Sequence, residues 1–342
     1  MYIDLRSDTV TKPSKEMLSF MAVCSAHSLG DDVAGEDPTV NALEQKLAEK
    51  FKMEAALFCP SGTMTNQIAI KLHTQPGDEV ILDYKSHTNS FEVGGIAFHS
   101  LASVKPIQTQ YGILSAKMVK NAINSDDIHK PPSTLVVLEN THNRGGGSCY
   151  KQEEIEAIRT VCLDAKLKMH LDGARIFNAI VANNEDPVFY GAHFDTISVC
   201  LSKGLGAPVG SVLLGSQPII KKARKLRKLF GGGMRQAGVI ASGGLYAIEN
   251  NIQRLADDHA KAKEIAQLLE SKSFVTEIYP VETNIIIFSI APNYMSGKDF
   301  GALLKEKNIL AYEIAPQQFR FVFHLDITSQ LQQELFNKLK SL

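Results

Sequence analysis

The sequence predicts an α/β protein with two domains: a large one built on a mostly parallel sheet, and a smaller α+β domain at the C-terminus. Short apolar runs alternate with amphipathic helical patterns through most of the 342 residues, as in parallel sheets covered on both faces. The pattern changes near residue 245. The length of the chain also favours two domains, because a single hydrophobic core stops growing at roughly 250–300 residues. We therefore expect a large domain with an N-terminal arm over residues 1–245 and a small domain over residues 246–342.

The elements of the large domain follow in order. A first helix is expected over residues 37–51, because Asp37 is a favourable N-cap and Pro38 suits the first helical position. Its apolar residues recur at helical spacing on one face. Strands are expected at residues 56–59, 79–83, 134–138, 169–172, 196–201 and 211–214, and helices between them include residues 115–124 and 151–165.

The C-terminal part begins with a long helical stretch over residues 236–269, which we expect to bend around Asn250 and Asn251. No Pro/Ser/Gly-rich spacer appears, so the domain boundary is placed inside a helix. Beyond it, strands are expected at residues 274–279, 284–290, 309–314 and 320–324, and helices at residues 298–307 and 329–340.

Charge and composition narrow the class of protein. A net charge of −1 gives no overall field to attract nucleic acid or anionic lipid, and the basic run at residues 221–228 is interpreted as a solvated helix face. No apolar stretch is long enough for a membrane span, and the charges near the N-terminus argue against an export signal. Five cysteines without a C-x-x-C pair argue against a disulfide framework. We expect a cytoplasmic protein that binds small molecules.

A turn of small residues, Pro-Ser-Gly-Thr-Met-Thr-Asn at residues 60–66, lies between a predicted strand and a helix that begins near Thr63. Glycine lets the backbone approach a ligand, hydroxyls donate hydrogen bonds, and a helix N-terminus offers free N–H groups. The turn is therefore suited to binding a phosphate. An ordinary strand-to-helix turn is the alternative.

Asp172 ends a predicted buried strand, where a carboxylate is costly unless it is paired with a cation. Arg175 lies three residues further on, so a structural Asp172–Arg175 pair is one interpretation. The other is that Asp172 faces a cationic group of a ligand.

Lys203 follows the predicted strand at residues 196–201 and is itself followed by Gly204 and Gly206. Desolvation at such a position lowers the pKa of a lysine toward that of a nucleophilic amine. A dinucleotide-binding loop is the rival interpretation, but Pro208 and a strand follow where a helix should begin.

Together, a phosphate-binding turn, a strand-end carboxylate and, 31 residues later, a strand-end lysine suit pyridoxal 5′-phosphate. The lysine would form the imine, the carboxylate would keep the pyridine nitrogen protonated, and the turn would hold the phosphate.

Nearly the whole chain resembles the low-specificity L-threonine aldolases, pyridoxal-phosphate enzymes of the aspartate aminotransferase fold (fold type I). The matching stretches include Asp-Leu-Arg-Ser-Asp-Thr-Val-Thr, Glu-Asn-Thr-His-Asn and Leu-Ser-Lys-Gly-Leu-Gly, and they lie at residues 4–11, 30–33, 35–39, 61–63, 139–143, 170–178, 201–206 and 231–236.

The resemblance implies roles for individual residues. Lys203 would carry the cofactor as a covalent aldimine, Asp172 would pair with the pyridine nitrogen, and His87 would stack on the ring. The phosphate would be held by Ser61, Gly62, Thr63 and Ser202, with Arg235 reaching it from a neighbouring subunit. The substrate carboxylate would be bound by Ser7, Arg175 and Arg320. His142 is the second histidine near the substrate hydroxyl, and either His87 or His142 would be the base. A homodimer or homotetramer with shared active sites is implied.

The resemblance further implies retro-aldol cleavage of L-threonine or L-allo-threonine to glycine and acetaldehyde. A β-eliminating lyase on the same scaffold and a non-catalytic pyridoxal-phosphate carrier are the alternatives. A metal hydrolase built on His170 and Asp172 lacks a suitably spaced third ligand, so no metal site is predicted. Ala34 replaces a usual tyrosine, and the run at residues 144–150 lacks a proline common nearby. Both departures bear on the range of substrates.

Overall fold

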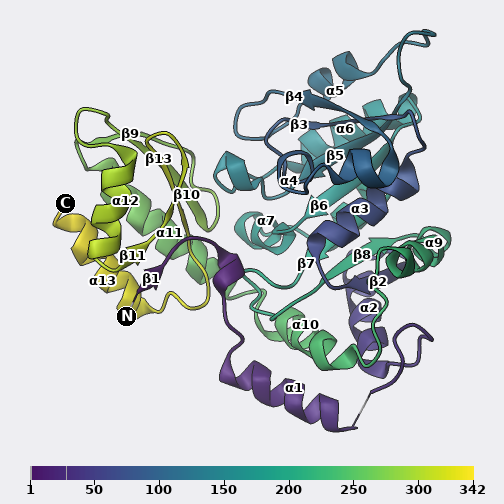
Figure 1. Cartoon of the computed structure of the whole chain (residues 1–342), viewed down its shortest axis with the longest axis horizontal. Helices are drawn as coiled ribbons and strands as arrows, with labels where there is room; N and C mark the ends of the chain where they lie inside the picture. Colours follow the sequence, from purple (N-terminus) through teal and green to yellow (C-terminus); the bar gives the residue numbers. More distant parts are fainter. Residues whose placement is uncertain (1, 28) are drawn as a thin grey trace.

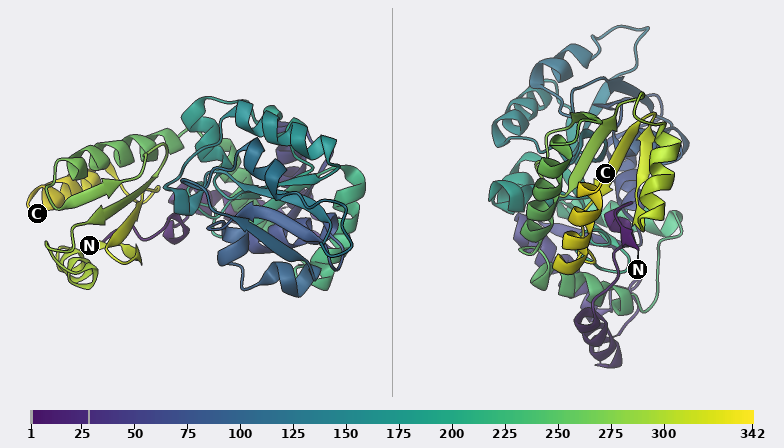
Figure 2. Two further views of the ribbon diagram at one scale, coloured as in Figure 1. Left: turned by 90° about the horizontal axis from the view of Figure 1, so that it is seen from above. Right: turned by 90° about the vertical axis from the view of Figure 1, so that its left-hand side faces the viewer.

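A computed structural model describes residues 2–27 and 29–342 of the chain. Figure 1 shows a larger α/β unit around a central sheet and a smaller α+β unit formed by the C-terminal part of the chain. The first described residues and the C-terminus both lie at the smaller unit, in all the views of Figures 1 and 2. No helix in the described part of the chain is long and apolar enough to cross a membrane.

The central sheet is mostly parallel, as predicted. Parallel pairing joins five of its strands in a row, whereas β8 runs antiparallel to both of its neighbours. The strands in spatial order are β2 (Ala55–Cys59), β8 (Ser211–Gly215), β7 (Thr196–Cys200), β6 (Lys168–Gly173), β5 (Ser133–Glu139), β3 (Glu79–Asp83) and β4 (Ser103–Ile107).

Helices cover both faces of this sheet, because alternate residues of each strand enter different cores. In β2, Ala56 and Phe58 belong to the main core, whereas Leu57 and Cys59 belong to the core on the opposite face. The main core also takes up side chains of α2 (Pro38–Phe51), α5 (Ala116–Ala122), α6 (Gln152–Asp164), α7 (Ile176–Asn183), α8 (Pro187–His193) and α10 (Gly238–Asn250). The opposite face is covered by α3 (Gly62–His73) and α9 (Gln217–Leu229).

The smaller unit is built on an antiparallel sheet of four strands, in the order β12 (Tyr312–Ala315), β13 (Gln318–Val322), β10 (Ile285–Ile290) and β9 (Val275–Ile278). Its helices are α11 (Leu255–Glu270), α12 (Gly297–Glu306) and α13 (Ser329–Lys340). The N-terminal arm reaches this unit, since β1 (Ile3–Asp4) pairs with β11 (Ile309–Leu310) and Leu5 enters its core. The division of the chain at residue 245 remains a prediction.

Shorter elements complete the chain: α1 (Lys15–His27), the single-turn α4 (His87–Ser90), and the short helices η1 (Asp8–Val10), η2 (Ile96–Ser100) and η3 (Asn143–Gly145). The expected bend near Asn250 is confirmed as the break between α10 and α11. The single strand expected at residues 309–314 is two strands, β11 and β12, which enter different sheets.

The solvated-face interpretation of the basic run is wrong for two arginines of α9. Arg227 is buried, pairs with Asp32 at 2.9 Å and donates to the carbonyl of Phe58 at 2.6 Å. Arg224 pairs with the buried Glu44. Helix α9 packs on β2 and turns Arg224 and Arg227 toward these acceptors, whereas the four lysines of the run are exposed, so only part of the run is structural.

Candidate active site

A cavity of about 360 Å³ brings together residues that follow the carboxyl ends of four sheet strands, β3, β5, β6 and β7, with residues of the N-terminal arm and of the smaller unit. It is lined by Ser7, Thr9, His87, Phe91, Asn143, Arg144, Arg175, Lys203, Tyr312, Glu313, Ile314 and Arg320. His87 follows β3, Arg175 follows β6, Lys203 follows β7, and Arg320 lies on β13. Open α/β sheets bind ligands at this edge, so the cavity is the candidate active site.

Lys203 lies in the loop between β7 and β8. The loop turns back at Gly206, whose φ of +79° favours glycine and whose N–H donates to the Lys203 carbonyl at 2.8 Å. Within residues 2–27 and 29–342, no hydrogen bond or ion pair engages the Lys203 ammonium group. The amine is therefore available to a ligand in the cavity.

Asp172 ends β6 and is buried. Its carboxylate accepts hydrogen bonds from the Asn66 side chain at 3.0 Å and from the backbone N–H of Ala174 at 3.2 Å, both neutral donors. Of the two interpretations of Asp172, the structural pair with Arg175 is wrong, because Arg175 turns to the N-terminal arm and binds Asp8. The structure thus leaves the negative charge of Asp172 without a direct cationic partner in the described part of the chain.

A buried network fixes the amide of Asn66, which lies on α3. Burial lowers the pKa of His170 to about 4, so this imidazole is neutral. Its Nε2 lies 3.1 Å from Asn66 Oδ1, which can only accept, so Nε2 carries the proton. The Asn66 amino group must then point the other way, where it donates to Asp172 and, at 2.9 Å, to Glu92.

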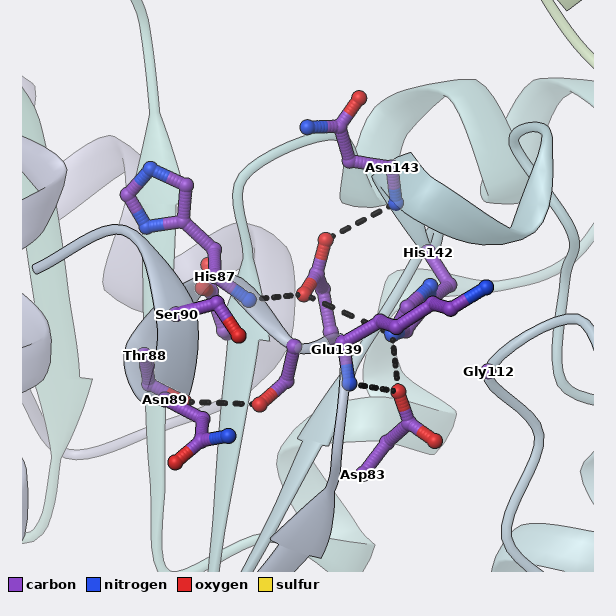
Figure 3. Close-up of polar contacts among 12 residues, drawn as sticks. Asp83, His87, Thr88, Asn89, Ser90, Gly112, Glu139, His142 and Asn143 are labelled. Atoms are coloured by element: carbon purple, nitrogen blue, oxygen red, sulfur yellow. Dashed lines mark hydrogen bonds and ion pairs between the residues drawn. The ribbon is translucent and has the colours of Figure 1, made fainter. Parts of the chain in front are cut away.

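His87 is the first residue of α4, and its side chain is about one third exposed. Its Nδ1 lies 3.0 Å from the buried Glu92, and its backbone N–H donates to Glu139 at 2.7 Å (Figure 3). Burial alone would lower the pKa of His87, but the hydrogen bond to Glu92 and the charges of Asp172, Glu92 and Glu139 outweigh burial and raise it. One nitrogen of His87 and one oxygen each of Glu92 and Asp172 lie within 4.8 Å of one another.

His142 is buried and does not line the cavity. Its Nε2 is 3.1 Å from Asp83 and 3.8 Å from Glu139, and its ring packs against Gly112, where a Cβ would lie 2.1 Å from the ring (Figure 3). Burial opposes protonation, but the charges of Glu139 and Asp83 raise the pKa of His142. Glu139 thus connects His142 with the backbone N–H groups of His87 and Asn143.

Three arginines line the cavity, and two of them, Arg175 and Arg320, come from different units. Arg175 is held by Asp8 through two hydrogen bonds of 2.7 and 2.6 Å. Arg320 donates to the side chain of Asn143 at 2.6 Å and to the carbonyl of Arg6 at 2.9 Å, and its Nε is buried without a partner. Burial and the charge of Arg175 lower the pKa of Arg320 to about 10. A carboxylate bound beside Arg320 would offset both its burial and its repulsion from Arg175.

The Asp8–Arg175 pair gives a stability prediction. Asp8→Asn keeps the shape of the side chain but leaves the buried guanidinium without its counter-charge, and breaking such a pair costs about 3–5 kcal/mol of unfolding free energy. Urea unfolding followed by circular dichroism measures the loss. Asp126→Asn, at an exposed loop position, is the control and should change the midpoint little. Equal midpoints for the two variants would show that the pair contributes no stability.

The predicted phosphate turn lies at the start of α3. Ser61 caps the helix by accepting from the Met64 N–H at 3.2 Å, and the side chain of Ser211, buried without a partner, faces Gly62. Thr63 is exposed. Helix α3 also carries Asn66, whose side chain donates to Asp172. The turn at the start of α3 is thereby connected to the Asp172 carboxylate.

Ser202 and Arg235 lie outside the cavity lining. The Ser202 hydroxyl contacts the Cys200 thiol at 3.6 Å. Arg235 is 65% exposed at its side chain and pairs with Asp31 of the same chain at 2.7 Å. Their roles toward a phosphate remain predictions.

Four residues of the site were not singled out from the sequence: Asp8, Asn66, Glu92 and Glu139. Each is a buried acid or amide that holds a predicted residue in place. Asp8 and Glu139 fall inside the family-like stretches at residues 4–11 and 139–143. An acid inside such a stretch is the signal that could have identified them.

Known proteins match this chain over most of its length. A profile described as β-eliminating lyase matches residues 4–292. The low specificity L-threonine aldolase of Escherichia coli (strain K12) is 40% identical over 329 residues, which cover 96% of this chain and 95% of that protein. The chain belongs to the low-specificity L-threonine aldolase family. The profile match also makes the chain a member of the broader β-eliminating lyase family.

Solved structures show that the fold is that of the threonine aldolases and related fold type I enzymes, as predicted. A threonine aldolase from Leishmania major superposes with a TM-score of 0.86 at 20% identity, covering 99% of this chain and 98% of that chain. A structure of SPT with its PLP internal aldimine gives a TM-score of 0.75 at 14% identity, covering 99% and 87% of the two chains. Membership of the threonine aldolase family makes this chain a carbon–carbon lyase of a pyridoxal-phosphate family.

Proposed function

We propose that this chain cleaves L-threonine and L-allo-threonine to glycine and acetaldehyde, with pyridoxal 5′-phosphate bound covalently at Lys203. The observation that carries the proposal is the combination of a free Lys203 amine with an uncompensated Asp172 carboxylate at one sheet edge. Membership of the low-specificity L-threonine aldolase family supports the choice of substrate.

The residues present fit this cofactor. The Lys203 amine suits the aldehyde carbon, and the buried Asp172, which has only neutral donors, suits a protonated pyridine nitrogen. The N-terminus of α3, with Ser61, Gly62 and Thr63, suits the phosphate. When bound, the cofactor supplies the electron sink that makes the Cα–Cβ bond labile.

The chain's own residues bind and orient the amino acid. We assign the substrate carboxylate to Arg320, whose Nε is unpartnered, and to Arg175 and Ser7 beside it. Planar guanidinium groups recognise carboxylates through paired hydrogen bonds. This fixes the substrate at one end, so that its hydroxyl-bearing carbon lies toward the histidine side of the cavity.

We assign the base to His87, because it lines the cavity, whereas His142 is buried and does not line it. The hydroxyl proton passes to the neutral imidazole of His87, and the C–O bond becomes a double bond as the Cα–Cβ bond breaks. A proton then returns to Cα and completes glycine. His142 acts as a positioning residue through Glu139, which holds the backbone of His87.

This assignment predicts an acid limb in the pH profile of kcat/KM. A base must be neutral, so activity rises with pH through the pKa of His87, which lies above its ordinary value of about 6.5. Glu92→Gln removes a negative charge from His87 and should move this limb to lower pH by about one pH unit. Glu153→Gln, on the exposed side of α6, is the control. An acid limb that stays in place in Glu92→Gln would contradict the assignment.

One incubation separates the proposed reaction from β-elimination. Purified holoenzyme is given L-threonine and L-allo-threonine, and acetaldehyde, glycine and 2-oxo acid are followed together. The proposal requires acetaldehyde and glycine in equal amounts. A 2-oxo acid and ammonia as the main products would identify a β-eliminating lyase, and no product from either amino acid would overturn the substrate.

We further propose a homodimer or homotetramer in which Arg235 reaches the phosphate of a neighbouring subunit. The exposure of Arg235 and of Thr63 supports this arrangement. The five free cysteines support a reducing, cytoplasmic compartment. Light scattering of the holoenzyme tests the assembly, and a monomeric mass would exclude it.

A further inference from the structure

A second pocket of about 220 Å³ adjoins the active-site cavity. It is lined by Lys85, Ser90, Phe91, Arg144, Ile314, Ala315 and Gln318. Phe91, Arg144 and Ile314 line both spaces, so the pocket is a side chamber of the cavity. Its lining includes two cations and no carboxylate.

Arg144 is a cation without a direct counter-charge. Its guanidinium carbon lies 4.7 Å above the Phe91 ring, and its Nη1 donates to the Ile314 carbonyl at 3.3 Å. In the residues the structure describes, no carboxylate lies within ion-pair distance of Arg144. Glu139, the nearest acid along its own segment, is engaged by two backbone N–H groups. An anion in the side pocket would therefore find an unneutralised guanidinium.

The backbone that carries Arg144 is held in place by the glycines that follow it. A Cβ on Gly145 would lie 1.9 Å from the Tyr111 carbonyl, and one on Gly147 would lie 2.4 Å from the Thr283 hydroxyl. Gly147 also has a φ of +78°. Only glycine fits these close approaches, so the loop presents Arg144 at a defined position between the two units.

Successive contacts join His87, Phe91 and Arg144. The rings of His87 and Phe91 are 5.9 Å apart between centroids, the Arg144 guanidinium lies over the Phe91 ring, and both Phe91 and Arg144 line the cavity and the side pocket. A carboxylate attached directly to the substrate's β-carbon would stop beside His87. A substrate whose aromatic β-substituent packs along Phe91 would place an anion at the far end of its ring beside Arg144 and Lys85.

We propose that the side pocket is a binding subsite for an aromatic β-substituent that ends in an anion. The inference rests on the proposed function and names a substrate class: β-aryl-β-hydroxy-α-amino acids with a carboxylate on the ring. The reaction is the same cleavage. The Cα–Cβ bond breaks, the hydroxyl proton leaves, and β-(4-carboxyphenyl)serine gives glycine and 4-carboxybenzaldehyde without a further co-reactant.

The test compares two substrates that differ in the charge at the ring's far end. The holoenzyme is assayed with β-(4-carboxyphenyl)serine and β-(4-methylphenyl)serine, and the ratio of their kcat/KM values is measured by release of the aldehydes. We expect the ratio to favour the carboxylate and to fall about ten- to hundredfold in Arg144→Gln, as for loss of a charge-assisted hydrogen bond. Arg144→Lys should retain part of the preference. A preference for the methyl compound in the unchanged protein would overturn the proposal.

A matched control removes a positive charge elsewhere. Lys117→Gln, at an exposed position of α5, lines neither space and should leave the ratio unchanged. The same ratio of kcat/KM values in Arg144→Gln and Lys117→Gln would overturn the subsite. An equal loss of kcat/KM for the carboxyl and the methyl substrate in Arg144→Gln would overturn it as well.

A binding measurement separates failure of the subsite from failure of the proposed function. L-Threonine is assayed in parallel, and binding of 4-methylbenzoate is measured by calorimetry in an Arg320→Gln background, which weakens the proposed substrate-carboxylate site, with and without the Arg144 change. If threonine is not cleaved, the proposed function fails, yet the subsite still requires 4-methylbenzoate to bind about tenfold more weakly to Arg144→Gln. Equal binding by the two proteins would contradict the subsite directly.

Discussion

Replacing Lys203 with alanine is expected to lower threonine cleavage roughly 10⁴-fold or more, because the variant loses the only amine lining the candidate active-site cavity among the described residues. The protein should still fold, since the Lys203 side chain makes no hydrogen bond or ion pair in the described part of the chain. Acetaldehyde release measures turnover, and thermal unfolding checks the fold.

The control for this experiment is Lys221→Ala, an exposed lysine on α9. It should retain nearly full turnover, which would exclude a general effect of losing a lysine. Turnover of Lys203→Ala within tenfold of the unchanged protein would show that another residue binds the cofactor.

Asp172→Asn is expected to lower turnover about 10²–10⁴-fold while part of the cofactor still binds. Asparagine has nearly the same shape, but its single carbonyl oxygen can accept from only one of the two donors, Asn66 and Ala174, which bind different oxygens of Asp172. The variant therefore loses the negative charge and one hydrogen bond. That charge is what raises the pKa of a cationic ligand group beside it.

The Asp172→Asn experiment measures kcat by aldehyde release and cofactor content by absorbance. Asp164→Asn, at the exposed end of α6, is the control and should match the unchanged protein. An unchanged kcat in Asp172→Asn would remove the electrostatic role of Asp172, whereas complete loss of bound cofactor would show that the residue acts only in binding.

The central strands could be predicted because their apolar runs are local. Strands β3, β6, β7 and β8 are each buried along nearly their whole length, so the residues alone carry the signal. Strand β4 was not predicted, because it lies at the edge of the sheet, is partly exposed and contains Pro106. A strand that is paired on one side only can have a sequence of mixed polarity.

Lys203 and Asp172 could be singled out because each directly follows or ends a buried strand. Their partners could not, because these come from remote segments: Asp8 and Arg175 are separated by 167 positions, and Asn66 and Asp172 by 106. The same applies to Arg227, whose acceptors lie in β2 and in the loop near Asp32. Charge pairs of this kind depend on how elements pack, and local periodicity carries no information about them.

Borohydride reduction of the holoenzyme, followed by peptide mass spectrometry, shows which lysine holds the cofactor. We expect a single phosphopyridoxyl modification, located on Lys203 and absent from the Lys203→Ala variant. The same modification on a different lysine, or its absence from the reduced protein, would contradict the assignment to Lys203.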